Sequence, residues 1–192
     1  MAKLKNKISL ASERSALLLW YKRSRRELPW RQSRDPYRIW ISEVMLQQTT
    51  VQAVIPYYER FLKKFPDLSS LAQAALEDVY EVWAGLGYYS RARNLHKSAQ
   101  ILNQQGFPQT AEGLLELPGF GPYTSRAVAS LAFNQKVGVL DGNVIRILTR
   151  RFGLAVDWWK GTERRQLQQL ADDLAQPPDA HLINQAMMEL GA

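Results

Sequence analysis

The sequence contains no cysteine among its 192 residues. Disulfide bonds, thiolate zinc sites, cysteine-ligated iron–sulfur clusters and cysteine nucleophiles are therefore excluded within these residues. Histidine is nearly as scarce, with only His96 and His181, so we expect no histidine-rich metal site. No apolar run approaches the roughly 18 residues that a membrane span requires, and the N-terminal stretch lacks the long apolar core of a secretory signal. These absences predict a cytoplasmic protein that has no contact with a membrane.

Positive charge, in contrast, is abundant. The chain has 25 Lys and Arg against 18 Asp and Glu, a net charge of +7. Such an excess suits a polyanionic partner, although many basic proteins bind no nucleic acid. Hydrophobic residues make up 46% of the chain and include six Trp, eight Tyr and six Phe. This composition predicts a packed core, in one large domain or two small ones.

Apolar residues recur at helical spacing along almost the whole sequence. Leu95, Ala99 and Leu102 are one example, and most such runs are closed by Gly, Pro or a polar turn. Asp35 followed by Pro36 has the pattern of a helix cap and first helical residue. The β-branched cluster KVGVL, Lys136 to Leu140, is too short to build a sheet. The pattern predicts an all-α protein of about ten helices.

The stretch ELPGFGPYTSRAV, Glu116 to Val128, places glycines and a proline directly before a helical run. Pro122 fits the first helical position, and Gly119 and Gly121 would let the backbone turn sharply and a phosphate approach the helix end. The Lys and Ser or Thr of a nucleotide-binding loop are missing, as is the strand of a dinucleotide fold. The pattern favours a helix-hairpin-helix motif, which binds DNA backbone phosphates. The alternative is an ordinary tight turn.

Two carboxylates occur in unusual contexts. Glu43 lies in IWISEVML, which leaves no wide polar helix face. It therefore lies at the polar margin, is paired to an Arg, or is partly desolvated with a raised pKa and able to act as a general acid. Asp141 follows the apolar VGVL and precedes a helical run. It is either a simple helix cap or a carboxylate presented at the edge of a cleft.

Six segments, taken together and in order, point to one family. They are LPWR (Leu28–Arg31), SEVMLQQT (Ser42–Thr49), GLGYYSRARNLH (Gly85–His96), LPGFGPYT (Leu117–Thr124), LDGNV (Leu140–Val144) and NQAMMELGA (Asn184–Ala192). This arrangement closely resembles the catalytic region of MutY-type adenine DNA glycosylases, within the endonuclease III or helix-hairpin-helix glycosylase superfamily. The resemblance covers nearly the whole chain, from about Leu28 to Ala192.

The resemblance implies base-excision repair of adenine mispaired with 8-oxoguanine or guanine. The adenine leaves the stack and enters a pocket, because its glycosidic bond is not reachable within the duplex. Glu43 matches the acid that protonates the departing base, and Asp141 matches the carboxylate that stabilises the cationic sugar. Asn143 matches the residue that orients this aspartate and its water. Tyr123 stands where lyase members carry a Schiff-base lysine, which predicts a monofunctional glycosylase that leaves the strand intact.

The resemblance also implies recognition residues. The residues that match the adenine pocket are Arg26, Trp30, Arg31, Gln185 and Glu189, with Arg25 an alternative to Arg26. Those that match duplex contacts are Gln48, Thr49, Leu86, Tyr88 and Arg91, with Arg93 as a further phosphate contact. The hairpin residues Gly119, Gly121, Tyr123 and Thr124 are also expected to bind DNA.

Two lobes with a cleft between them are expected from this family. Residues 1–28 and 133–192 would form one helical lobe, and residues 29–132 a six-helix barrel with the helix-hairpin-helix at about 111–132. Full-length members continue into four cysteines that bind a four-iron four-sulfur cluster and then a domain for 8-oxoguanine. This chain ends before them, which favours a truncated chain over a cluster-free variant.

The expected partner is double-stranded DNA carrying an A:8-oxoguanine or A:G mispair, bound by a monomer associated with the nucleoid. Three alternatives remain open. They are a non-catalytic helix-hairpin-helix binding module, a helical scaffold that binds another protein, and an inactive fragment of a glycosylase.

Overall fold

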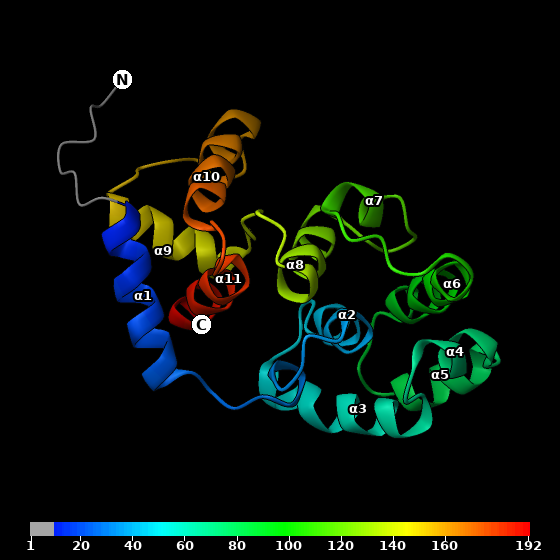
Figure 1. The fold of residues 1–192 in the computed structure, drawn as a ribbon. Coiled ribbons are helices and arrows are strands. Elements are labelled where there is room, and N and C mark those ends of the chain that lie inside the picture. Colours follow the sequence, from blue (N-terminus) through cyan, green and yellow to red (C-terminus); the bar gives the residue numbers. More distant parts are fainter. Residues whose placement is uncertain (1–9) are drawn as a thin grey trace. The chain divides into compact units, whose positions relative to one another are not determined.

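The computed structural model describes residues 10–192 (Figure 1). This range contains eleven α-helices, one 3-10 helix and no strand, which confirms the all-α prediction. The sequence predicted about ten helices, and the additional one is the short α4, Leu68–Gln73. Its start is fixed by a capping box in which Asp67 accepts from the Ser70 amide and Ser70 bonds back to the Asp67 backbone. None of the helices in this range combines the length and apolar character that a membrane span needs.

The chain divides into two compact units, which we describe separately. The central unit comprises Glu27–Phe133, and the terminal unit combines Asn134–Ala192 with the segment that ends at Arg26. Glu43 therefore belongs to the central unit and Asp141 to the terminal unit.

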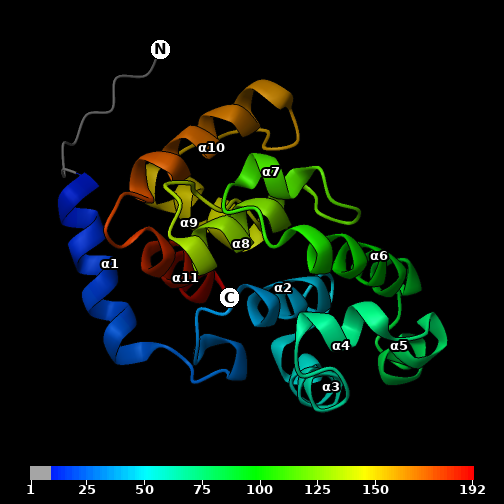
Figure 2. The ribbon, with the colours of Figure 1, turned by 45° about the vertical axis from the view of Figure 1, so that its right-hand side comes forward.

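The central unit contains a 3-10 helix and seven α-helices, where the sequence predicted six. They are η1 (Pro29–Arg31), α2 (Pro36–Met45), α3 (Val51–Lys64), α4, α5 (Leu76–Trp83), α6 (Tyr89–Gln105), α7 (Ala111–Leu115) and α8 (Pro122–Phe133). Within this unit α2 packs against α3, α6 and α8 (Figures 1 and 2). A helix with three neighbours loses its solvent face, and eight of the ten residues of α2 are buried.

The start of α2 is fixed as the sequence predicted. The Asp35 carboxylate accepts a hydrogen bond of 2.9 Å from the Tyr37 amide, and Pro36 occupies the first helical position. Farther along the helix, the Trp40 ring stacks on Phe120 of the hairpin with 5.3 Å between ring centroids. The apolar face of α2 thereby holds the hairpin in place.

The predicted helix-hairpin-helix is formed by α7 and α8, joined by a turn over residues 116–121. Helix α8 begins at Pro122, as expected, and its first internal bond runs from the Ser125 amide to the Gly121 carbonyl over 3.0 Å. The N–H groups that precede this bond receive no acceptor from the helix itself.

The terminal unit is built from four helices around one apolar core. They are α1 (Leu10–Ser24), α9 (Gly142–Phe152), α10 (Gly161–Leu174) and α11 (Ala180–Gly191). Leu148 of α9, Leu167 of α10 and Met187 of α11 are almost fully buried in this core. Helix α11 packs against both α9 and α1 (Figure 1).

The β-branched segment at residues 137–140 is extended but pairs with side chains instead of a strand. The buried Asn184 side chain accepts from the Val139 amide at 3.0 Å and donates to the Val137 carbonyl at 2.8 Å. The Gly138 amide donates to Asp172 at 2.7 Å. Because these groups satisfy the backbone, the segment is buried without a sheet and leads directly into Asp141.

Candidate active site

Glu43 is a carboxylate inside an apolar helix. It is 5% exposed, and among residues 10–192 it is the one acidic residue in the buried class. Its Oε2 accepts a hydrogen bond of 2.8 Å from the hydroxyl of Tyr123 on α8. Burying an ionised carboxylate costs several kcal/mol. A cost of this kind marks Glu43 as a candidate catalytic acid.

The two hairpin glycines do different things. Gly119 has a φ of +79°, and a side chain there would lie 2.7 Å from the Cβ of Asn94 on α6. Gly119 therefore makes the turn and allows the hairpin to pack closely against Asn94. At Gly121 the φ angle is not positive, and the space beside it is empty to 4 Å. The close approach expected of both glycines is available at Gly121.

Several residues expected to touch DNA differ sharply in exposure. Tyr88 is 59% exposed and Gln48 is exposed as well, whereas Leu86 is 7% exposed and Thr124 is 2% exposed. The Thr124 hydroxyl accepts a hydrogen bond of 3.1 Å from Gln47, a residue that the sequence had not singled out. Leu86 and Thr124 are thus buried, whereas Tyr88 and Gln48 are exposed.

Arg91 is directed into the protein. Its two terminal nitrogens donate to backbone carbonyls, and its Nε is buried with no hydrogen-bond partner. Burial lowers its pKa, which the nearby Tyr88 partly opposes. These contacts differ from the phosphate contact that the sequence predicted for Arg91.

Asp141 is a helix cap, as expected. Its Oδ1 accepts from the Val144 amide at 2.7 Å, and its Oδ2 accepts from the Asn143 side chain at 3.2 Å. Burial raises the pKa of Asp141, and the hydrogen bonds from Val144 and Asn143 oppose that rise. The same hydrogen bonds hold the carboxylate at the start of α9, where the helix dipole favours a negative charge.

The end of α11 lies directly on this cap. A side chain added at Gly191 would lie 2.5 Å from the Asn143 carbonyl oxygen, and the Arg146 guanidinium donates to the Gly191 carbonyl. The lack of a side chain at Gly191 therefore permits the backbone contact that fixes the first turn of α9.

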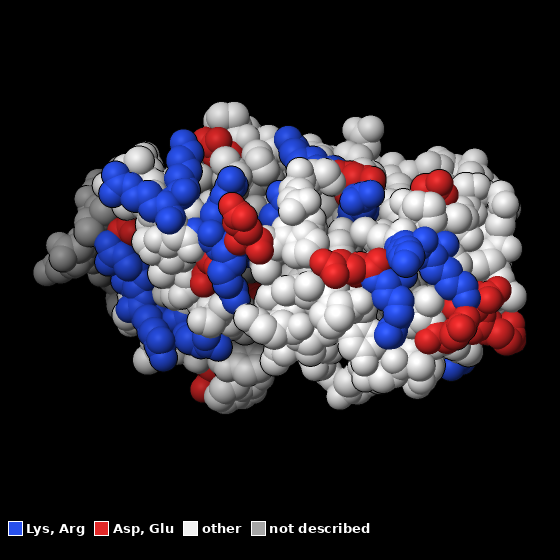
Figure 3. Space-filling model, turned by 90° about the horizontal axis from the view of Figure 1, so that it is seen from below, with Lys and Arg blue, Asp and Glu red and all other residues white. Residues whose placement is uncertain are grey.

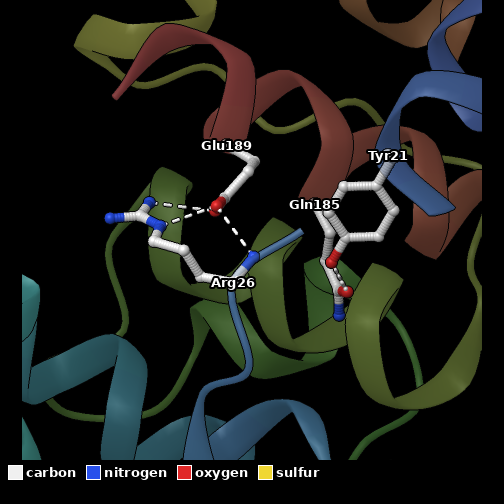
Figure 4. Close-up of polar contacts among 4 residues, drawn as sticks. All are labelled: Tyr21, Arg26, Gln185 and Glu189. Carbon is white, nitrogen blue, oxygen red and sulfur yellow. Dashed lines mark hydrogen bonds and ion pairs between the residues drawn. The ribbon is translucent and has the colours of Figure 1, made fainter. Parts of the chain in front are cut away.

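Three of the expected adenine-pocket residues lie in the terminal unit, where Arg26 pairs with Glu189 and Gln185 pairs with Tyr21 (Figure 4). Arg26 donates to Glu189 through Nε at 2.6 Å and Nη2 at 2.9 Å, and its backbone amide adds a bond of 3.1 Å. The hydrogen bond to Glu189 raises the pKa of Arg26. Gln185 lies one helical turn before Glu189, and its Oε1 accepts a bond of 2.7 Å from the Tyr21 hydroxyl. Arg25 instead lies over the Tyr21 ring, 6.0 Å from its centroid.

Tyr21 is a residue that sequence reasoning missed. It is buried in α1 and is separated from Gln185 by 164 positions, so no local pattern could have linked them. The other expected pocket residues, Trp30 and Arg31, lie in η1 of the central unit. Trp30 is buried edge-on against Tyr58, with ring centroids 5.3 Å apart.

The residues present do not fit a resident metal or iron–sulfur cluster. The chain has no cysteine, and residues 10–192 contain no group of three or more His, Asp or Glu placed to hold an ion. Charged side chains form groups on the surface. On the face drawn in Figure 3, Lys and Arg gather over the terminal unit, and a second group of Lys and Arg lies over the central unit beside the Asp and Glu at its edge.

Comparison with known proteins places this site in a family. Residues 41–176 match the HhH-GPD superfamily of base excision DNA repair proteins. The chain belongs to this superfamily. The match includes Glu43, the hairpin and Asp141, and thus spans parts of both units of this HhH-GPD protein.

Individual relatives agree with that placement. The adenine DNA glycosylase of Mus musculus is 47% identical over 191 aligned positions, which cover 93% of this chain and 37% of the mouse protein. The structure of a thermostable thymine-DNA glycosylase superposes with a TM-score of 0.84 at 29% identity, covering 95% of this chain and 86% of that one. A non-covalent endonuclease III–DNA complex, at 22% identity and a TM-score of 0.73 over 94% and 85% of the two chains, shares the fold. The HhH-GPD chain thus spans little more than a third of its mouse relative.

Proposed function

We propose that the protein is a monofunctional adenine DNA glycosylase that removes adenine opposite 8-oxoguanine or guanine. The observation that carries this proposal is Glu43, buried in α2 and hydrogen-bonded to Tyr123 over 2.8 Å. It agrees with the 47% identity to a protein named adenine DNA glycosylase. The excess of positive charge and the helix end at Pro122 support binding of the DNA backbone, and the substrate would be the DNA of the nucleoid.

The proposed reaction assigns different roles to the two carboxylates. Glu43 delivers a proton to the adenine ring, so that the base departs as a neutral molecule when the bond to the sugar breaks. Asp141, ionised and held by Val144 and Asn143, stabilises the positive charge that develops on the sugar. Water then adds to the sugar carbon and loses a proton, leaving an abasic site.

Two features of Tyr123 indicate whether the DNA strand is cleaved after the base is removed. Tyr123 occupies the position where a lyase needs an amine, and a phenol cannot form an imine with the opened sugar. Its hydroxyl is instead committed to Glu43. The proposed product is therefore an unbroken strand. An iron–sulfur cluster, as in full-length relatives of the proposed type, would need cysteines from outside these residues.

A single-turnover assay on four duplexes tests the proposal. Adenine opposite 8-oxoguanine or guanine should be excised, with strand breaks appearing only after alkali, whereas A:T and oxidised-pyrimidine duplexes should stay intact. Cleavage of the oxidised pyrimidine instead would point to the endonuclease III branch. DNA binding without any excision would identify a non-catalytic module or an inactive fragment. Efficient borohydride trapping of a covalent protein–DNA adduct would overturn the monofunctional assignment.

A further inference from the structure

Two exposed side chains of the central unit have backbones that non-glycine residues rarely adopt. Gln48 has a φ of +58° and Tyr88 a φ of +51°. Gln48 follows the end of α2, and Tyr88 precedes the start of α6. Such left-handed conformations are strained and persist only when neighbouring groups hold them. Neighbouring groups must therefore hold the backbones of Gln48 and Tyr88 in this conformation.

Arg91 contacts the residue before each of them. Its Nη1 donates to the Gln47 carbonyl at 2.6 Å, and its Nη2 donates to the Gly87 carbonyl at 3.3 Å. The same nitrogens also bond the carbonyls of Val44 (3.0 Å), Met45 (3.1 Å) and Leu86 (3.2 Å). One guanidinium therefore bridges the last turn of α2 to the loop before α6.

Ring contacts complete the bridge. The guanidinium lies 5.2 Å from the Tyr88 ring centroid and 5.5 Å from that of Trp83. A cation at this place also complements the negative end of the α2 dipole. Because both terminal nitrogens are engaged and Nε is buried, little of Arg91 remains for a phosphate.

We propose that Arg91 is a positioning residue that holds Gln48 and Tyr88 together in the orientation needed to enter a DNA duplex. The inference rests on the proposed function, in which these two residues are expected to contact the DNA duplex. Lysine is not expected to replace arginine, because Arg91 uses two separate terminal nitrogens to bond carbonyls on two sides, whereas the donors of lysine lie on a single nitrogen.

Hydrogen exchange tests the bridge without relying on activity. The amides of Thr49, Leu86 and Arg91 are hydrogen-bonded to the carbonyls of Leu46, Trp83 and Tyr88 and report on the two segments. In Arg91→Met and Arg91→Lys, exchange should rise about tenfold or more at both segments and not elsewhere. Arg34→Met is the matched control, because Arg34 also bonds two carbonyls, at the end of α8. Unchanged exchange at either segment, or an equal rise in Arg34→Met, overturns the proposal.

DNA assays then separate positioning from phosphate contact. With wild-type protein active, Arg91→Lys should slow adenine excision and the rise in fluorescence of an extruded 2-aminopurine by about tenfold or more, while the salt dependence of DNA binding stays unchanged. A fall of about one in the salt slope, with normal extrusion, would make Arg91 a phosphate contact and overturn the proposal. Failure of the wild-type protein to excise adenine would instead refute the proposed function, and the exchange result would still decide the bridge.

Discussion

Glu43 of the central unit and Asp141 of the terminal unit are held by opposite means. Glu43 lies inside a buried helix, where its carboxyl group accepts a hydrogen bond from the Tyr123 hydroxyl. Asp141 caps a helix, where the Val144 amide and the Asn143 side chain each donate a hydrogen bond to its carboxylate. A carboxylate that caps a helix has a structural role and is therefore weak evidence of a catalytic site. A buried carboxylate without such a role is stronger evidence. The difference makes Glu43 the more informative of the two.

The largest expected effect tests the role of Glu43 in that comparison. Glu43→Gln keeps the shape and an acceptor for Tyr123 but cannot deliver a proton, so the single-turnover rate of adenine excision should fall by about 10²–10⁴-fold. DNA affinity and the melting temperature should not fall. Glu77→Gln, at an exposed position of α5, is the control and should match wild type. A rate loss below tenfold would remove Glu43 as the acid.

The second effect concerns how the terminal unit presents Asp141. Asn184→Leu keeps the branching and the number of heavy atoms of the side chain but leaves the Val139 amide and the Val137 carbonyl without their partner. The free energy of unfolding should fall by about 2–4 kcal/mol, since each buried unpaired group costs about 1–3 kcal/mol. Urea titration measures the change, with the exposed Gln169→Leu as control. Equal stability of the two variants would show that Asn184 does not hold this segment.

The sequence predicted local features of the fold better than contacts between distant segments. The helix starts at Pro36, Pro122 and Gly142 were predictable, because caps and prolines act on their immediate neighbours. The pairing of Asn184 with Val137 and Val139 joins positions 45 or more residues apart and leaves no local pattern. Sequence could therefore predict the elements and both carboxylates, but not how either carboxylate is held.

Arg91 shows the same limit in the central unit. The family resemblance predicted a phosphate contact for Arg91, because a sequence match shows the charge of a side chain and not its direction. The carbonyls that it bonds belong to segments that come near α6 only in the folded chain. Left-handed backbone at Gln48 and Tyr88 was equally hidden, since neither residue is glycine.

The third prediction concerns the pH dependence of stability. The folded state raises the pKa of Asp141 and so binds its proton more tightly than the unfolded state. The free energy of unfolding contributed by Asp141 should therefore decrease as pH rises from the unfolded pKa, about 3.9, through the higher folded value. Asp141→Asn keeps a cap and removes this decrease, so its melting temperature at neutral pH should equal or exceed that of wild type.

Thermal melts between pH 3 and 8 measure this effect as the difference between Asp141→Asn and wild type. Asp35→Asn, at the exposed cap of α2, is the control and should not gain stability at neutral pH. Excision by Asp141→Asn should be lost even though the protein is at least as stable. A variant that is less stable than wild type at neutral pH would contradict the predicted stability change, and retained excision would contradict the catalytic role of Asp141.

The smallest expected effect contrasts Arg91 with Arg93. Arg93 is exposed on α6, two positions after Arg91, and is the better candidate for phosphate binding. Arg93→Met should reduce the slope of log affinity against log salt by about one. The salt slope for Arg91→Lys should stay unchanged. Comparing the slopes of the two variants therefore distinguishes a DNA contact from an internal bridge. Equal slopes for wild type and Arg93→Met would remove the phosphate contact.

The most direct test of the account is single-turnover excision from an A:8-oxoguanine duplex at saturating protein, with and without alkali. The account predicts that wild-type protein releases adenine and leaves a strand that breaks only after alkali, while Glu43→Gln at equal DNA occupancy releases essentially none. Strand breakage without alkali, or equal adenine release by the two proteins, would contradict it.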